Sequence, residues 1–216
     1  MAFRVTASQA RALVAIRTCR TAVRGGHVWR CDRPDCRHEQ YAYHSCRHRA
    51  CPQCQHDQTR QWLARATARL LPCPYWLLTV TLPSELRRVA RGHRAAVLDL
   101  LLRAAQTAVL ELGWTHLGAR VGTLAVLHTW TRALLWHPHV HLLVTGGGLA
   151  PDGQSWRPAR HPAYLLPQRA LAARVRTHLH DGLARLGLLA AAPPAVWTRP
   201  WITHGQPPGT RARVLA

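Results

Sequence analysis

Lysine and asparagine are both absent from this sequence, so all 29 of its Lys-or-Arg positions are arginine. Acidic residues are also scarce, with nine Asp and Glu, which leaves a formal net charge of +20 and an isoelectric point near 11.6. An excess of this size favours a polyanionic partner, and nucleic acid is the first candidate. The absence of lysine and asparagine also fits a coding bias toward G/C-rich codons, which would enrich arginine whatever the protein binds. The alternative is therefore a basic surface that is hydrated and binds no nucleic acid.

Long apolar runs are missing as well. The first residues lack the apolar core of a signal peptide, and the longest apolar stretches, such as 95–102, are short and flanked by arginine. We therefore expect a cytoplasmic protein without a transmembrane helix. In a reducing cytoplasm, the seven cysteines are better suited to metal binding than to disulfide bonds. Six of them crowd into the N-terminal quarter, and only Cys73 lies outside it.

The amino-acid composition changes twice along the chain. Residues 1–56 are rich in Cys, His and Arg and poor in aliphatic side chains. A bound metal ion must therefore supply the stability that an apolar core would otherwise give this segment. Residues 57–74 are expected to form a basic linker helix, because apolar side chains recur on one face and arginines occupy the others. Residues 75–216 have the pattern of an α+β domain with a mainly antiparallel sheet flanked by helices.

Within the last region, β-branched and aromatic runs predict strands, and Ala/Leu/Arg-rich runs predict helices. Ser84 is suited to cap the start of a long helix and Gly113 to end it, while Gly92 weakens its middle. The expected strands are 75–82, 121–130, 140–145 and 196–204, and the expected helices are 84–112 and 167–189.

Two closely spaced cysteine pairs mark the N-terminal module. A tetrahedral structural zinc needs four soft ligands, and two short loops that each carry a pair of thiolates can supply them. Free buried cysteines are the alternative, but this segment has almost no aliphatic core in which to bury them. The expected zinc ligands are Cys31, Cys36, Cys51 and Cys54. The remaining candidates, for the same site or for a second one, are Cys19, Cys46, His27, His44 and His48.

Basic and aromatic side chains are interleaved with these cysteines. Arg47, Arg49 and Arg60 offer positive charge for phosphate groups, and Tyr41 and Tyr43 offer rings on which bases can stack. A zinc module with a purely structural role is the alternative. We expect the three arginines to contact DNA.

A group of histidines lies within a strongly apolar run, HPHVHLLV. His139 and His141 are two residues apart, so in a strand they point to the same face, about 6 to 7 Å apart, and can bind one cation. His128 on a neighbouring strand is the expected third ligand, with a hydrogen-bonded core histidine as the alternative. His137, nearer the turn, is expected to support the site or to bind phosphate. A second His-x-His pair lies in a helical segment, where such side chains diverge.

Three stretches taken together resemble one known family. In chain order they read CRTAVRGGHVWRC, YAYHSCRHRACPQCQ and LHTWTRALLWHPHVHLLVTGGGL. They resemble the zinc-binding rolling-circle transposases of bacterial insertion sequences. These are of the two-tyrosine type and carry a His-hydrophobic-His (HUH) motif. The resemblance extends from about Cys19 to Pro208. It implies that His139 and His141 hold a divalent ion, Mg or Mn, which polarises a phosphate of single-stranded DNA while a tyrosine attacks and forms a 5′-phosphotyrosine.

Two features depart from that family. Its tyrosine nucleophile lies on a helix downstream of the segment that here reads TRPWITHGQPP, and none of the four tyrosines has this position. The spacing of Cys31 and Cys36 is also longer than the family's. We therefore expect a transposase with an incomplete catalytic domain at 75–216, which binds zinc, a divalent ion and single-stranded transposon ends without completing cleavage. The alternatives are a non-catalytic DNA-binding remnant or regulator of transposition, and a metal-dependent hydrolase, although no carboxylate base accompanies the histidines.

Overall fold

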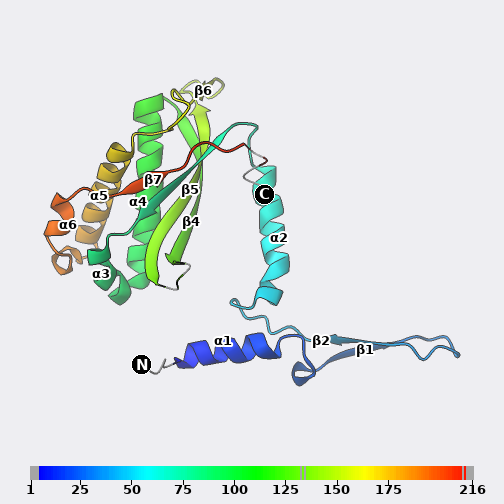
Figure 1. Cartoon of the computed structure of the whole chain (residues 1–216). Helices are drawn as coiled ribbons and strands as arrows, with labels where there is room; N and C mark the ends of the chain where they lie inside the picture. Colours follow the sequence, from blue (N-terminus) through cyan, green and yellow to red (C-terminus); the bar gives the residue numbers. More distant parts are fainter. Residues whose placement is uncertain (1–4, 132, 134, 211, 213–216) are drawn as a thin grey trace. The chain divides into compact units, whose positions relative to one another are not determined.

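The computed structural model describes residues 5–131, 133, 135–210 and 212. The chain divides into two compact units, Met1–Leu70 and Leu71–Ala216, and each is described by itself (Figure 1). No helix in the described part of the chain is long and apolar enough to cross a membrane.

Two helices and a two-stranded ribbon make up the first unit. In chain order the elements are α1 (Ala7–Thr18), the 3-10 turn η1 (Ala22–Arg24), β1 (Gly26–Arg30), β2 (Glu39–Tyr43) and α2 (Pro52–Ala68). Strands β1 and β2 pair antiparallel, and α2 contains most of the helix expected as a linker. Among the described residues of this unit only Ala15, Cys19 and Cys51 are buried, so the unit has almost no apolar core.

A five-stranded antiparallel sheet forms the centre of the second unit. Its strands are β3 (Tyr75–Thr81), β4 (Arg120–Trp130), β5 (Trp136–Leu149), β6 (Trp156–Pro158) and β7 (Thr203–Gly205). Their order across the sheet is β4-β5-β3-β7, and the short β6 also pairs with β5. The helices and helical turns are η2 (Ser84–Leu86), α3 (Arg87–Gly92), α4 (Arg94–Leu112), the π-helical η3 (Gly113–Leu117), α5 (Gln168–Arg185), η4 (Leu189–Ala191) and α6 (Ala195–Thr198).

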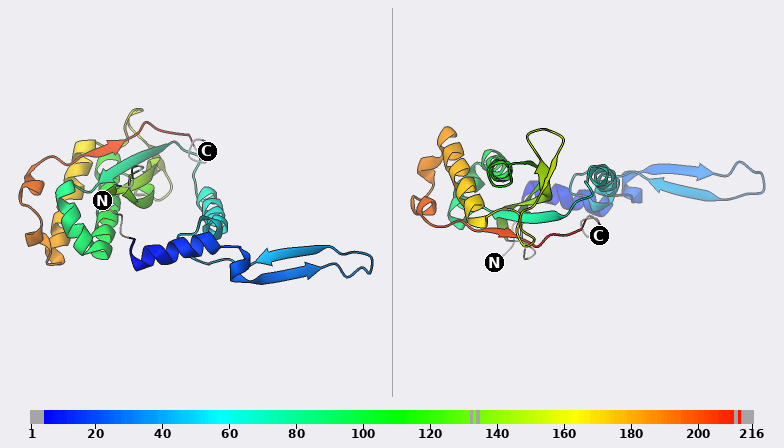
Figure 2. Two further views of the ribbon diagram at one scale, coloured as in Figure 1. Left: turned by 60° about the horizontal axis from the view of Figure 1, so that its bottom comes forward. Right: turned by 90° about the horizontal axis from the view of Figure 1, so that it is seen from above.

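The two faces of this sheet have different surroundings. Alternate residues of β3 and β5, such as Leu78, Val80, Val140 and Leu142, are buried and pack with α4 and α5 in the core. The residues between them are partly exposed. Helices α4 and α5 lie on the same side of the sheet (Figure 2). Within the described part of the second unit, no helix covers the opposite face, and this open face carries the histidines.

Helices α4 and α5 are also joined by an ionic contact. Glu111 Oε2 on α4 lies 2.9 Å from Arg174 Nη1 and 2.9 Å from His178 Nε2 on α5. Burial raises the pKa of the Glu111 carboxyl, but hydrogen bonds from His178 and Arg174 outweigh it and hold this pKa below its ordinary value. The carboxylate therefore stays ionised at neutral pH and bridges the two helices.

The α+β class and the antiparallel sheet are confirmed, whereas two expected elements differ from the structure. The helix expected at 84–112 is interrupted at His93, whose φ of −127° and ψ of 49° are not helical. The strand expected at 196–204 was wrong for its first half, since α6 occupies Ala195–Thr198 and only Thr203–Gly205 is a strand. Pro194, directly before α6, favours the start of a helix because its φ is preset near the helical value.

Candidate metal centres

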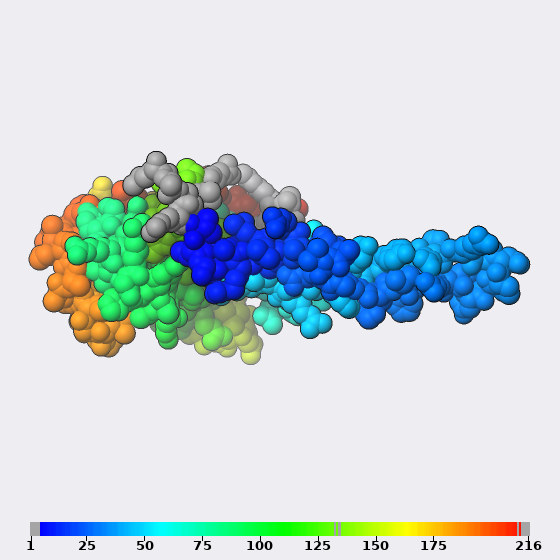
Figure 3. All heavy atoms as spheres, turned by 90° about the horizontal axis from the view of Figure 1, so that it is seen from below, coloured from blue at the N-terminus to red at the C-terminus, as the bar shows by residue number. Residues whose placement is uncertain are grey.

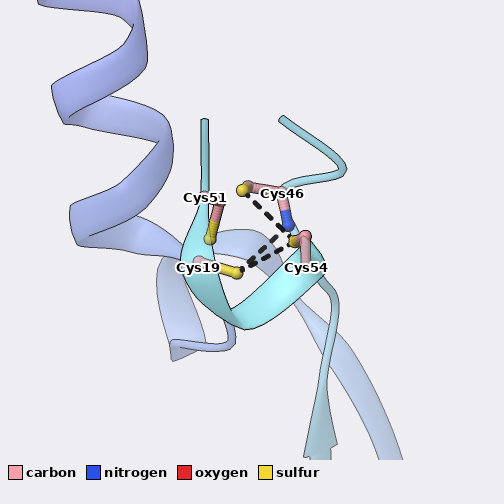
Figure 4. Close-up of side chains that lie close together, drawn as sticks. All are labelled: Cys19, Cys46, Cys51 and Cys54. Atoms are coloured by element: carbon pink, nitrogen blue, oxygen red, sulfur yellow. Dashed lines mark hydrogen bonds between the residues drawn. The ribbon is translucent and has the colours of Figure 1, made fainter. Parts of the chain in front are cut away.

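Four cysteines of the first unit meet in one place, which we call the thiol cluster: Cys19, Cys46, Cys51 and Cys54 (Figure 4). Their sulfur atoms all lie within 4.8 Å of one another. Cys54 Sγ is 3.5 Å from Cys19 Sγ and 3.5 Å from Cys46 Sγ. A tetrahedral zinc with Zn–S bonds of about 2.3 Å separates its sulfurs by about 3.8 Å. The spacing and the all-thiolate donor set therefore fit a structural zinc.

The backbone around the thiol cluster is shaped to support it. Cys19 follows the end of α1 and Cys51 caps the start of α2. The backbone N–H of Cys46 donates to Cys19 Sγ, at 3.4 Å. Arg20 and Arg47, each directly after a cluster cysteine, have left-handed φ values of 55° and 51°. Such values cost a non-glycine residue about 1–2 kcal/mol, so the surrounding contacts must hold these two turns.

The thiols of the cluster share their protons unequally. Burial raises the pKa of Cys54, but hydrogen bonds from Cys19 and Cys46 outweigh it and lower this pKa to about 6. At Cys19 the hydrogen bond from the backbone N–H of Cys46 lowers the pKa. Burial and the neighbouring thiols outweigh this effect and raise the pKa of Cys19 to about 12. Four crowded thiols cannot all ionise without a cation among them.

Cys31 and Cys36, expected as zinc ligands, do not join the thiol cluster. They lie in the turn at the far end of the β1–β2 ribbon, where Cys31 N donates to His38 O at 3.1 Å and Cys36 N to Arg33 O at 3.0 Å. Five paired residues separate this turn from the other end of the ribbon, a length of roughly 17 Å. The structure thus brings Cys19 and Cys46, the further candidates, together with Cys51 and Cys54, and leaves Cys31 and Cys36 apart from them.

Three imidazoles meet on the open face of the sheet, and we call them the imidazole cluster: His128, His139 and His141. Their candidate ligand nitrogens all lie within 4.8 Å of one another. The strand pairing explains this, because His128 on β4 is directly opposite His139 on β5, and His141 follows two residues later on the same face. Sequence reasoning expected this set, and the structure brings it together.

Hydrogen bonds fix the orientation of two of these rings. His139 Nδ1 lies 2.7 Å from the carbonyl oxygen of His137, so its N–H donates there and Nε2 is left with a lone pair. His141 Nδ1 lies 3.0 Å from Thr79 Oγ1 on β3. Burial, followed by the charges of His128 and His139, lowers the pKa of His141 and favours its neutral form. Neutral, oriented imidazoles are the state in which histidine binds metal ions.

Arg87 on α3 extends this arrangement and was missed by sequence reasoning. Its Nη2 lies 2.6 Å from His137 Nδ1, so the guanidinium donates and His137 accepts. Burial, followed by the charges of Arg87 and His139, lowers the pKa of His137. Nothing in the sequence pointed to Arg87, whereas Thr79 could have been found from the alternation of β3.

The expected DNA-contacting arginines of the first unit are all exposed: Arg47, Arg49 and Arg60. Arg47 lines a hollow at the end of the ribbon together with His27, Tyr43 and His44. The fourth expected DNA contact, His137, lies in the second unit and is bound to Arg87.

Comparison with known proteins assigns both units to one class. Residues 2–82 match a family model described as transposase zinc-binding domain, and residues 122–208 match one described as putative transposase. A putative transposase of Sinorhizobium fredii (strain NBRC 101917 / NGR234) is 42% identical over 170 residues, which cover 78% of this chain and 42% of that protein. The transposase for insertion sequence element IS801 of Pseudomonas savastanoi pv. phaseolicola is 39% identical over 135 residues, covering 62% and 32%. The chain thus spans less than half the length of these relatives.

Solved structures of the conjugative relaxase TrwC also match. The metal-bound complex with oriT DNA gives a TM-score of 0.41 at 16% identity, covering 87% of this chain and 57% of TrwC. The complex with a 27-mer DNA that comprises the recognition hairpin and the cleavage site gives 0.39 at 18% identity, covering 51% and 44%. The family models and the two transposases confirm the resemblance drawn from the sequence motifs. The chain belongs to the insertion-sequence transposases that carry an N-terminal zinc-binding domain.

Proposed function

We propose that this chain holds single-stranded DNA and a divalent cation for the strand-cleavage step of rolling-circle transposition. The observation that carries the proposal is the imidazole cluster, three imidazole nitrogen donors on an open face of the sheet that a DNA strand can reach. The membership of the chain in a transposase family supports the same reaction class. Transposon ends are the proposed substrate.

The three histidines of the imidazole cluster would hold the cation. His128, His139 and His141 would bind the cation from one side and leave its other positions open for phosphate oxygens. The chemistry that a divalent ion supplies in such a site is polarisation of a phosphate oxygen and neutralisation of developing charge. Since all three donors are imidazole nitrogens, we propose that Mn²⁺ binds more tightly than Mg²⁺, which prefers oxygen ligands.

Arg87 is the proposed second phosphate contact. Its guanidinium is held by His137, which is two residues from His139, so positive charge lies beside the cation site. A guanidinium binds phosphate oxygens in a bidentate manner with strong charge-assisted hydrogen bonds. We assign His137 the role of positioning Arg87 rather than of binding the cation.

The attacking group is proposed to be a tyrosine outside the four in this sequence. Tyr41 and Tyr43 belong to the first unit, and Tyr164 is stacked on His161 at 4.3 Å. Tyr75 lies four positions before Thr79 on β3, about 13 Å along the strand from the residue that contacts His141. The 216-residue chain by itself is therefore expected to bind cation and DNA without forming a covalent adduct.

Cation binding is the first experiment. Electron paramagnetic resonance of Mn²⁺ titrated into zinc-loaded protein should detect one site that His139→Ala or His141→Ala weakens at least tenfold. His180→Ala is the matched control, because His180 belongs to the helical His-x-His pair on α5 and lies outside the cluster. Equal Mn²⁺ binding by the wild type and His139→Ala would overturn the cation site and leave a zinc-dependent DNA-binding regulator as the function.

Adduct formation is the second experiment. Labelled single-stranded DNA of the transposon end is incubated with protein and Mn²⁺, and covalent complexes are resolved on a denaturing gel. The chain should give no adduct, whereas fusing to it the part of the Sinorhizobium fredii relative that lies outside the matched region should produce one. His139→Ala in the fusion should abolish the adduct. An adduct with the chain alone would refute the assignment of the nucleophile to another segment.

A further inference from the structure

The β1–β2 ribbon presents an uncovered face with two tyrosines. All ten of its strand residues are exposed. Val28 is paired with Tyr41, and Gly26 with Tyr43, so these side chains share one face, while Trp29 lies on the other. Val28, Tyr41 and Tyr43 are 47%, 57% and 41% exposed. On the side drawn in Figure 3, no other segment of the first unit lies over the ribbon.

The two tyrosine rings are nearly parallel and lie farther apart than neighbouring bases of a stack. Their centroids are 6.3 Å apart and their planes differ by 28°. Bases along one DNA strand are spaced by roughly 3.4 Å, so the two rings are separated by about two such steps. Gly26, opposite Tyr43, adds no side chain, and a Cβ there would lie 2.5 Å from the carbonyl oxygen of Ala42. The ring of Tyr43 is therefore left open on this side.

The polar edge of Tyr41 is anchored while its ring stays free. Tyr41 Oη donates to Glu39 Oε2 at 2.8 Å, and Arg30 Nε lies 2.7 Å from Glu39 Oε1. This network fixes the ring before any ligand arrives, which lowers the entropy lost on binding.

A hollow lies at the end of the ribbon that carries Tyr43. It has a volume of about 470 Å³ and is lined by His27, Ala42, Tyr43, His44, Ser45 and Arg47. Seven arginines and three carboxylates lie between positions 20 and 49, and one of these carboxylates, Glu39, is already paired with Arg30. The charge around the tyrosines is thus complementary to a polyphosphate, which favours nucleic acid over an apolar protein surface.

We propose that Tyr41 and Tyr43 form a stacking platform for the bases of single-stranded DNA, with Arg47 binding an adjacent phosphate. This inference rests on the proposed function and assigns a second DNA contact to the first unit. Stacking on an aromatic ring tolerates any base, because every base has a π-face. Duplex DNA keeps its bases stacked on one another, so the platform should discriminate against it.

The test is a titration of labelled oligodeoxythymidine followed by fluorescence anisotropy, with the full chain loaded with zinc. Tyr41→Leu or Tyr43→Leu should weaken binding about 5- to 100-fold without changing its salt dependence. Tyr43→Phe keeps the ring and should bind like the wild type. Trp29→Leu removes a more exposed ring from the opposite face of the same ribbon and should stay within about twofold of the wild type. Arg47→Gln should flatten the salt slope by roughly 0.7.

Each result separates this inference from the proposed function. If the Leu variants hold their zinc and bind as tightly as the wild type, the platform is refuted, and a protein contact becomes the use of this face. Equal effects of Trp29→Leu and Tyr43→Leu would also refute it, and so would equal affinity for duplex DNA. If the wild type fails to bind single-stranded DNA at all, the proposed function fails together with the platform.

Discussion

Replacing one thiolate of the thiol cluster should unfold the first unit and leave the second intact. Only Ala15, Cys19 and Cys51 are buried among its described residues. Burying the one non-cysteine side chain, Ala15, contributes less than about 1 kcal/mol, while ordering the backbone costs about 1–2 kcal/mol per residue. Zinc binding supplies about 10–16 kcal/mol in small zinc domains, which makes it the main stabilising contribution here.

The expected loss of zinc affinity can be worked out from the number of ligands, which is four. If they share that free energy evenly, the loss of one costs about 2.5–4 kcal/mol, which lowers zinc affinity roughly 10²- to 10³-fold. Cys46→Ser should have this effect. Cys36→Ser is the matched control, because Cys36 is a partly exposed cysteine of the same unit that lies outside the cluster.

Two measurements check this prediction. Zinc content per chain should fall in Cys46→Ser and stay unchanged in Cys36→Ser. Hydrogen exchange followed by mass spectrometry should find the amides of β1 and β2 unprotected in Cys46→Ser, while β3 and β5 keep their protection. If Cys36→Ser releases zinc and Cys46→Ser retains it, the ligand set described above is refuted.

Three further predictions concern the second unit. Thr79→Val removes the hydrogen bond to His141 and should weaken Mn²⁺ binding about tenfold, as measured by titration, whereas Thr79→Ser should retain it. Glu111→Gln should lower the free energy of unfolding by about 0.5–1 kcal/mol at neutral pH. Because the folded pKa of Glu111 is lowered, this difference should vanish in urea titrations as the pH falls through that pKa. Leu142→Ala in the fully buried core should cost about 2–5 kcal/mol, visible as a lower Tm.

The imidazole cluster could be predicted from the sequence because its geometry is local. Side chains of a strand repeat every two residues, so His139 and His141 had to share a face once the run HPHVHLLV was read as extended. The third histidine, His128, could be placed beside them because strands that follow one another in the sequence tend to pair, and β4 and β5 are neighbours in the sheet. Arg87 lies on α3, about fifty residues before His137 in the sequence. No local pattern predicts the contact between these two side chains.

The thiol cluster was harder to predict because a hairpin intervenes. Cys31 and Cys36 are closer in sequence to Cys51 than Cys19 is, but the β1–β2 pairing carries them to the far end of the ribbon. The ribbon itself gave no signal, since both of its faces are exposed and an amphipathic alternation is therefore lacking.

The β4–β5 hairpin has a consequence for the order of folding. Its three imidazoles lie within residues 128–141, so bringing them together closes only a short loop at small entropic cost. The imidazole cluster can thus form as soon as this hairpin does, before the distant β7 joins β3. The thiol cluster instead needs Cys19 and Cys54 to meet across the whole ribbon, so its assembly waits for zinc. A chain emerging from the ribosome would therefore bring the imidazole cluster together quickly, and complete the thiol cluster only when zinc is supplied.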